Sequence, residues 1–388
     1  MNEWKSVRLG DVCEIQSGGT PSRSKTEYWK NGTIPWVKIG DFSGKYLNKT
    51  TEHITQKGLE NSSAKLFSKG TILYSIFATL GEATILNIDA TTNQAIAGIK
   101  IKDKSSIDID YLFAYLKSLK EEVNRIGRGV AQNNINLSIL KSFTVPLPPL
   151  ETQKQIAKQL NKCTTLLEKH KQMLEKYDTL IKSRFIEMFG DPDTNPKGWN
   201  IKTLNEVCRK ITDGKHGGCK LDDKSDYYYV GAREIFDLNI HYETAQNITK
   251  EDFEKDYKRC NLEIGDFCIV NTGATIGKTA IAKDKRTTHT LLQKSVALLK
   301  VKPEEIIPIY LQYSYITNES MYKVESASAQ PNLLLSKIRE TKLMVPPISL
   351  QNDFAAFVQQ IDKSKFVVQK SLEKAETLYK SLMQEYFG

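Results

Sequence analysis

The sequence contains an internal duplication that extends over most of its 388 residues. The segment Trp4–Cys13 returns as Trp199–Cys208, and further segments follow in the same order at offsets between 195 and 199 residues. The matching pairs include Gly70 and Gly265, Gly81 and Gly277, Tyr111 and Tyr310, Gln132 and Gln330, Gln153 and Gln351, and Phe189 and Phe387. Insertions this small are expected in loops. The duplication predicts two similar modules, and two similar modules usually recognise two similar targets.

Each copy begins with a mixed segment of short strand-like runs followed by one helix. The runs are separated by Gly, Asn and Asp residues, as is typical of strands between turns. In the first copy we expect strands at 33–39, 71–76, 83–86 and 95–99 and a helix at 108–125. In the second copy we expect strands at 227–230, 266–270, 278–281 and 295–299 and a helix at 309–321. Strands with an inserted helix and no regular βαβ alternation predict an α+β fold.

A long helical segment follows a Pro-Pro pair in each copy. Apolar residues recur there mostly at alternating spacings of four and three, which is the pattern of a coiled-coil seam. We expect the two seams to pack on each other, because an isolated helix of this kind would expose its seam to water. His170 and Lys365 interrupt the seams, and we interpret them as side chains that reach solvent, with a register-fixing contact as the alternative. The residues expected to pair are Ile156, Leu160, Leu167, Leu174, Ile181, Phe354, Val358, Ile361, Val368 and Leu372.

These segments predict four parts. They are a first mixed domain at 1–147 (domain 1), a central spacer helix at 148–190, a second mixed domain at 191–345 (domain 2) and a C-terminal spacer helix at 346–388. If the two helices are antiparallel, the second returns to domain 1, and the tandem repeat becomes a pseudo-two-fold arrangement. About 39 residues at a rise of about 1.5 Å give a spacer on the order of 60 Å.

Composition limits the class of protein. A hydrophobic fraction of 40% and a charged fraction of 26% are ordinary for a soluble globular protein. The net charge of +9 is compatible with a polyanionic partner, and equally with a merely Lys-rich protein. Six cysteines without a Cys-x-x-Cys pair indicate reduced thiols and a cytoplasmic location. No signal-like N-terminus and no run of 18 apolar residues occur, so we expect neither secretion nor a membrane span.

Motifs of catalysis are incomplete. The segment Thr272–Thr279 is similar to a phosphate-binding P-loop, but Thr272 stands where that motif requires glycine. We therefore favour a glycine turn between two strands, with a phosphate contact from Lys278 as another possibility. No methyltransferase tetrapeptide of the Asp-Pro-Pro-Tyr type occurs, and His216 with Cys219 has no further metal ligands at usable spacing. These gaps predict a binding protein without catalytic residues, metal or cofactor of its own.

The repeated segments resemble the specificity subunit of type I restriction-modification enzymes over the whole chain. The openings Trp4–Val12 and Trp199–Val207 carry this resemblance, together with Gly18–Ser22, Ala131–Ile135, Pro148–Gln153 and Phe185–Gly190. One departure is Asp213–Gly217, which stands in place of Ser17–Pro21. The difference is what we expect if the two domains recognise different bases.

The resemblance implies a non-catalytic subunit. In that family, each of two target-recognition domains reads one half of a split double-stranded DNA sequence, and the antiparallel helices set the gap between the halves. The helices also dock two modification subunits, which bring S-adenosylmethionine. Restriction subunits with ATP-driven translocation join that core.

Candidate DNA contacts are polar and basic residues in loops beside glycines, because phosphates are bound by Lys and Arg and base edges by Arg, Lys, Asn, Gln, Ser and Thr. In domain 1 they are Thr20, Ser22, Arg23, Lys38, Arg128, Gln132 and Asn133. In domain 2 they are Lys215, His216, Lys220, Arg233, Lys278 and Gln330. Two other functions stay open from the sequence: an NTPase built around Gly273–Thr279, and a coiled-coil adaptor with no nucleic-acid role.

Overall fold

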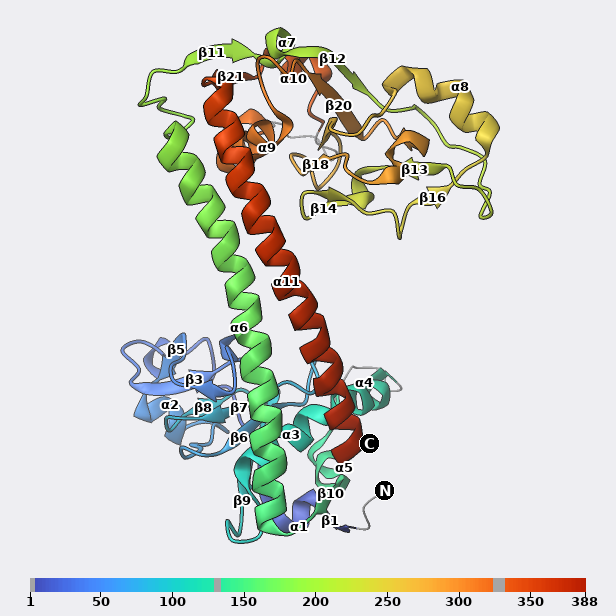
Figure 1. Ribbon diagram of the computed structural model, residues 1–388. Helices are drawn as coiled ribbons and strands as arrows, with labels where there is room; N and C mark the ends of the chain where they lie inside the picture. Colours follow the sequence, from blue (N-terminus) through green and yellow to red (C-terminus); the bar gives the residue numbers. More distant parts are fainter. Residues whose placement is uncertain (1–3, 129–133, 324–331) are drawn as a thin grey trace. The chain divides into compact units, whose positions relative to one another are not determined.

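The computed structural model describes residues 4–128, 134–323 and 332–388. The chain divides into two compact units: unit 1 comprises Met1–Lys171 with Lys370–Gly388, and unit 2 comprises Gln172–Gln369. Two helices, α6 (Leu150–Phe189) and α11 (Ile348–Phe387), each contribute one half to each unit (Figure 1). Within the described residues, no helix combines the length and the apolar character needed to cross a bilayer.

Unit 1 contains a five-stranded sheet in the order β2-β9-β6-β7-β4 and a three-stranded sheet in the order β5-β3-β8. The first sheet consists of Cys13–Ser17, Ile96–Ile101, Ile72–Ser75, Ala83–Leu86 and Tyr46–Leu47. The second consists of Glu52–Ile54, Ile34–Val37 and Thr91–Thr92, and a ribbon pairs β1 (Lys5–Arg8) with β10 (Thr144–Leu147). The helices are α1 (Leu9–Val12), α2 (Gln56–Glu60), α3 (Ile109–Ser118), α4 (Lys120–Arg128) and α5 (Leu137–Ser142).

Unit 2 repeats this plan. Its main sheet has the order β12-β20-β17-β18, and its second sheet has the order β16-β13-β19. The strands are Cys208–Asp213, Val296–Val301, Phe267–Val270 and Thr279–Ile281, then Gln246–Asn247, Tyr228–Val230 and Thr290–Leu292. Short pairs join β11 (Asn200–Thr203) to β21 (Lys342–Val345) and β14 (Ile235–Phe236) to β15 (Asn239–Ile240). The helices are α7 (Leu204–Val207), α8 (Lys250–Cys260), α9 (Pro308–Thr317) and α10 (Leu335–Glu340).

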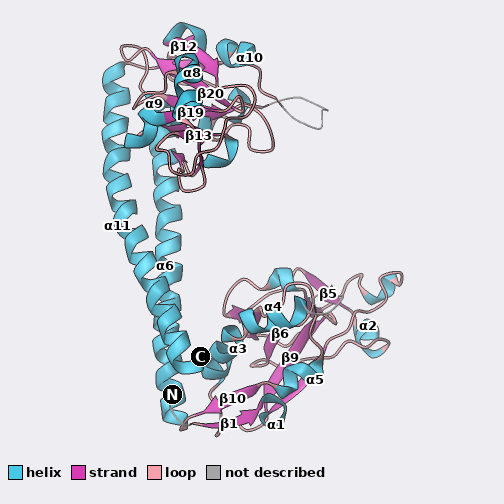
Figure 2. Ribbon diagram, turned by 90° about the vertical axis from the view of Figure 1, so that its right-hand side faces the viewer, coloured by secondary structure: helices cyan, strands magenta, loops and turns pink. Residues whose placement is uncertain are grey.

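Each unit has its own hydrophobic core between its main sheet, one helix and the long helices. Figure 2 shows α3 of unit 1 beside the C-terminal end of α11. Tyr111 and Leu112 of α3 join Ile72 and Ile99 of the sheet in one buried cluster, against which Phe387 of α11 packs. In unit 2, Tyr310 of α9 occupies the place of Tyr111, and Phe189 of α6 occupies the place of Phe387. The end of each long helix therefore completes the core of a mixed domain.

The two long helices run antiparallel within each unit. In unit 1 the Tyr386 hydroxyl donates a hydrogen bond of 2.6 Å to Gln159. In unit 2 the Lys365 ammonium lies 2.6 Å from Asp178, and Phe354 packs on Phe185. Lys365 therefore forms an ion pair between the two helices. We favoured the interpretation that its side chain reaches solvent, which does not include this contact. Of the residues expected to pair, Ile156, Leu160, Ile181, Phe354, Val358 and Leu372 are buried, and Leu167, Leu174, Ile361 and Val368 are partly buried.

The predicted strands lie within two residues of the observed bounds, and the α+β class with paired coiled-coil helices is confirmed. The prediction of one helix over 108–125 is wrong. Helix α3 ends at Ser118 and α4 begins at Lys120; at Leu119 between them ψ is −5°, away from the α-helical value of about −42°. The predicted helix at 309–321 ends at Thr317, where Asn318 adopts an extended conformation and caps the short η5 turn (Glu319–Met321).

Candidate nucleic-acid interface

Several loops of unit 1 meet at one end of the main sheet. Ser17 at the end of β2 lies opposite Ala97, and Ser75 at the end of β6 lies opposite Ile96, so two strands end where β9 begins. The loop after β6 also meets the segment at 134–136, because the Ile135 amide donates to the carbonyl of residue 76 at 3.0 Å. The loop after β2, the loop after β6 and the segment at 134–136 are therefore neighbours, although they lie far apart along the chain.

Two glycines fix the loop that follows β2. The Gly18 amide donates to the Ile96 carbonyl at 3.1 Å, and the Gly19 amide donates to the Thr92 carbonyl at 2.9 Å. A Cβ atom at Gly18 would overlap Thr92, and one at Gly19 would overlap Ser63. Gly18 thus permits a close approach of this loop to the strand β8, and Gly19 a close approach to Ser63, which side chains would prevent.

Two tryptophans hold the same loop from the other side. The Trp36 indole donates to the Gly19 carbonyl and the Trp29 indole donates to the Ser22 carbonyl, both at 3.1 Å. The two rings meet edge to face, with centroids 5.0 Å apart. The loop backbone is therefore held at two points by aromatic side chains that follow it in the sequence, 7 and 17 residues after the carbonyls that they bond.

A carboxylate between two cations completes this cluster. Glu52 on β5 lies 2.6 Å from an Arg23 guanidinium nitrogen and 2.5 Å from the Lys38 ammonium. Lys38 and Arg23 lower the pKa of the Glu52 carboxyl through these contacts. Thr20 is partly buried and its hydroxyl donates to Gln94 at 2.5 Å, whereas Ser22 is exposed and lies 2.8 Å from Ser24. The structure therefore brings Thr20, Ser22, Arg23 and Lys38 together.

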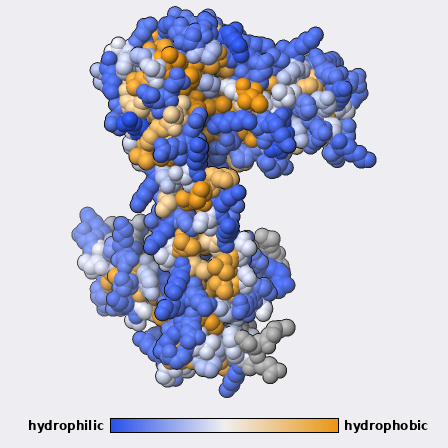
Figure 3. Space-filling model, viewed as in Figure 1, coloured by the Kyte–Doolittle hydropathy of each residue, from blue (hydrophilic) through white to orange (hydrophobic). Residues whose placement is uncertain are grey.

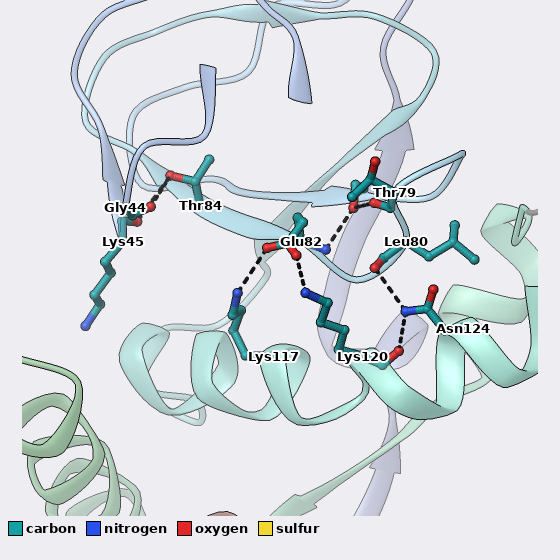
Figure 4. A network of polar contacts seen from close by, with 10 residues as sticks. Gly44, Lys45, Thr79, Leu80, Glu82, Thr84, Lys117, Lys120 and Asn124 are labelled. Carbon is teal, nitrogen blue, oxygen red and sulfur yellow. Dashed lines mark hydrogen bonds and ion pairs between the residues drawn. The ribbon is translucent and has the colours of Figure 1, made fainter. Parts of the chain in front are cut away.

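Helix α4 leads toward the remaining candidates of domain 1 along the chain. The backbone of Arg128 ends α4, whereas its side chain, Gln132 and Asn133 lie outside the described residues. Glu82, in the loop before β7, contacts Lys117 of α3 at 3.2 Å and also Lys120, the first residue of α4 (Figure 4). Asn124 of α4 donates to the Leu80 carbonyl at 3.3 Å in the same network. These contacts place the first half of α4 near the β6–β7 turn.

Unit 2 has the same frame at the corresponding end of its main sheet, where frame means a glycine-containing loop held by backbone hydrogen bonds and by an aromatic side chain. The Gly214 amide donates to the Val296 carbonyl at 3.1 Å, and the Lys215 amide donates to the Leu292 carbonyl at 2.7 Å. An aromatic residue again holds the loop, because the Tyr229 hydroxyl donates to the Gly217 carbonyl at 2.6 Å. Tyr229 on β13 thus has the role that Trp36 has on β3, with a phenol in place of an indole.

The polar side chains on this second frame differ from those on the first. Lys215 is largely buried, and its ammonium lies 2.5 Å from Asp256 of α8, which raises the pKa of Lys215. The charged ammonium of Lys215 is therefore already paired with a carboxylate of unit 2. His216 is exposed and lies 3.4 Å from Asp213, and Lys220 is exposed while its amide donates to Asp252.

Arg233 and Lys278 are exposed, and the described part of the chain gives neither of them an ion-pair partner. Lys278 follows the turn between β17 and β18, where Gly273 and Gly277 adopt positive φ values of 99° and 88°. A strand follows this turn, whereas a P-loop leads into a helix. The geometry is thus the glycine turn that we favoured, and Gln330 lies outside the described residues.

The long helices carry exposed apolar side chains on a largely hydrophilic molecule (Figure 3). On α6 they are Leu166, Met173, Leu180 and Ile186, and on α11 they are Phe366, Val367 and Leu378. Exposed apolar residues gathered on one element are typical of protein interaction sites.

Trp29, Trp36, Glu52 and Gln94 belong to the cluster of domain 1 but were not among the predicted site residues. Glu52 and Trp36 sit on paired strands, directly opposite each other. No spacing in the sequence relates either residue to Arg23, because the relation depends on the pairing of β3 with β5. The run Gly18-Gly19 was the one local signal of a constrained loop.

Comparisons with known sequences and structures agree on one protein family. The family model described as "Type I restriction modification DNA specificity domain" matches residues 1–176 and 196–376. The chain is 26% identical to the type I restriction enzyme MjaIX specificity subunit of Methanocaldococcus jannaschii, over 92% of this chain and 87% of that protein. It is also 26% identical to the EcoprrI specificity subunit of Escherichia coli, over 93% and 87%. The fold is similar to that of the type I restriction-modification S subunit from M. genitalium, with a TM-score of 0.61, 17% identity and coverage of 100% and 97%.

Proposed function

The chain belongs to the type I restriction-modification DNA specificity family, and we propose from this that its two mixed domains each read one half of a bipartite duplex target. The main support is the repeated frame: a glycine-containing loop at the same end of the main sheet in each unit, held by an aromatic side chain. The frame is shared but its polar residues differ. Two readers of one architecture and different surface chemistry fit a target with two unlike halves.

The paired helices set the gap between the half-sites in this proposal. They are also the docking surface for two modification subunits, and the exposed apolar residues of α6 and α11 support this role. S-adenosylmethionine and ATP would be bound by partner subunits, the ATP by restriction subunits. We propose no catalytic residue for this chain, because the P-loop-like turn leads into a strand and lacks the motif's first glycine.

A domain exchange tests the two-reader proposal. Residues 1–147 would be replaced by the equivalent domain of a relative, and methylated sites would be mapped by sequencing in cells that contain the modification subunit. We expect one half of the methylated sequence to change while the other half and the gap stay the same. A change in both halves at once would contradict the assignment of one half to each domain.

The matched control is the reciprocal exchange of residues 191–345, which should change the other half. If neither exchange altered the methylated sequence, recognition would lie outside both mixed domains. If no methylation depended on this chain, its role in a type I complex would be wrong.

A further inference from the structure

Arg23 is held in one orientation before any ligand binds. Its guanidinium carbon lies 3.6 Å from the centre of the Trp29 ring and 4.9 Å from that of Trp36. The backbone around it is fixed as well, because the Trp29 indole bonds to the carbonyl of the preceding residue, Ser22. A long side chain on an exposed loop normally loses rotamer entropy on binding. For Arg23, much of that loss has already occurred on folding.

Glu52 occupies only part of the Arg23 guanidinium. The ion pair joins Glu52 to one terminal nitrogen, Nη1, at 2.6 Å, and the described residues give Arg23 no second carboxylate. A guanidinium has five N–H donors, so a two-donor edge is still available. About half of the side chain (52%) is exposed to solvent, so a ligand can reach Arg23.

Arg286 in unit 2 shows the contrasting arrangement. It also lies over an aromatic ring, 4.4 Å from the centre of Tyr242. However, its Nε and Nη2 atoms both donate to Asp284, at 2.9 and 2.7 Å. The bidentate edge of Arg286 is therefore already occupied by a carboxylate of its own unit, and this arginine serves as a structural counterpart to Arg23.

We propose that Arg23 is a specificity-determining residue that recognises one guanine in the half-site of domain 1, through the O6 and N7 acceptors in the major groove. This inference rests on the proposed function. An arginine edge matches that acceptor pair in a bidentate way, whereas phosphate binding needs no such orientation. Glu52 is a positioning residue, because it holds Nη1 and thereby fixes which edge faces the ligand. Lys38 shares Glu52 and supplies a cation without a planar edge.

The counterpart loop of unit 2 cannot make the same contact. Cys219 and Lys220 follow the glycine loop there, and the lysine on that loop, Lys215, is engaged by Asp256. We therefore expect no arginine-dependent guanine contact from this loop of domain 2. This asymmetry gives the experiment an internal control.

The test uses the assembled modification complex and a duplex library with both half-sites randomised. Wild-type chain should select a bipartite sequence. Arg23→Lys should select the same gap and the same domain 2 half, but should lose discrimination at a single G·C pair of the domain 1 half by about tenfold or more. Glu52→Gln should weaken the same position to a smaller extent. Arg286→Lys, the matched control, should select the wild-type sequence.

A second measurement uses the unaltered protein, so it does not depend on how well a variant folds. Each guanine of the domain 1 half is replaced in turn by 7-deazaguanine, which lacks the N7 acceptor. One position should lower the affinity of the wild-type complex about tenfold, and Arg23→Lys should be insensitive to that same replacement. Sensitivity at no position, or equal sensitivity in both proteins, would overturn the role of Arg23. A wild-type complex that selects no bipartite sequence would instead overturn the proposed function.

Discussion

Gln153 and Gln351 make the same three hydrogen bonds, each at the first turn of one long helix. The Gln153 amide nitrogen donates to the carbonyls of Pro148 and Ser106 at 2.9 and 3.0 Å, and its oxygen accepts from the Asp108 amide at 2.9 Å. Gln351 bonds in the same way to Pro346, Glu305 and Ile307, at 2.9, 3.0 and 3.0 Å. Both side chains are buried. Each glutamine therefore fixes a long helix to the loop that begins the domain helix.

We predict that Gln351→Ala lowers the free energy of unfolding by about 3 kcal/mol, because one amide and two carbonyl groups would lose their buried partner. Gln153→Ala should cost a similar amount. Chemical denaturation followed by circular dichroism measures both. Gln360→Ala, an exposed glutamine on the same helix α11, is the control and should change stability by no more than about 0.5 kcal/mol. A stable Gln351→Ala protein would show that the contacts are replaceable by water.

Lys300 is a buried lysine in the β20 strand, and we predict that Lys300→Met is strongly destabilising. Its ammonium lies 2.6 Å from Asp266 and 2.8 Å from Glu263. The substitution would leave Asp266 buried without a cation, which costs about 3 kcal/mol or more at neutral pH. Lys100→Met is the matched control, because Lys100 has the equivalent place in β9 and is exposed.

The loss in Lys300→Met should depend on pH. Burial raises the pKa of Asp266 in the folded wild-type chain, and removing Lys300 removes a contact that lowers it. A carboxyl whose pKa is raised by folding stabilises the folded state when protonated and loses that contribution as the pH rises. The difference in stability between Lys300→Met and wild type should therefore shrink as the pH falls from 7 toward about 4. A constant difference over this range would mean that Asp266 does not titrate.

Within unit 1, Leu372 of α11 occupies a seam position, whereas Leu378 of the same helix is exposed. Leu372 is 6% exposed and Leu378 is 52% exposed. We predict that Leu372→Asp costs about 3 kcal/mol or more, because it buries an unpaired charge, whereas Leu378→Asp changes stability little. Leu174→Asp in unit 2 should fall between them, because Leu174 is only partly buried. Equal melting temperatures for the two α11 variants would contradict a seam at Leu372.

DNA binding by the assembled complex should weaken steeply with salt, because Lys and Arg residues of both domains displace counterions from phosphates. The logarithm of the affinity should fall linearly with the logarithm of the salt concentration. Lys278→Ala should make this slope shallower by about one phosphate contact without altering the target sequence. Affinity that does not depend on salt would exclude DNA as the partner.

Deletion of one heptad from α6 and of the facing heptad from α11 should alter the gap alone. Seven residues shorten each helix by about 10 Å, and the coiled-coil seam is retained. A comparable length of duplex, about three base pairs, turns by roughly a third of a helical repeat. We therefore expect either a shorter gap or loss of binding, as measured by selection from a library with variable gap. A changed sequence in either half-site would contradict a pure spacer role.

The sequence predicted the parts of the framework that are periodic or repeated. Coiled-coil spacing identified α6 and α11, and the duplication located the equivalent loops. Strands β2 and β12 were missed, since both follow a four-residue helix and neither shows a long alternating pattern. The break at Leu119 was missed because the apolar pattern continues through it.

The candidate site was predicted only in part because it depends on pairing between distant segments. Arg23 and Lys38 were identified as loop cations, but their common partner Glu52 lies on another strand. Lys215 was selected by the same reasoning, yet Asp256 of α8 holds its ammonium. Whether a loop lysine is available to DNA depends on such acidic neighbours, and local composition does not reveal them.

The division of both long helices between two units has a consequence for synthesis on the ribosome. Unit 2 consists of the continuous stretch Gln172–Gln369, so all of its residues emerge before Lys370 does. Unit 1 needs Phe387 against Tyr111 and Tyr115, and those aromatic contacts cannot form until translation has passed the whole of domain 2. The domain made first is thus completed last. A nonsense mutation shortly after residue 370 would leave the second domain whole and deprive the first of part of its core.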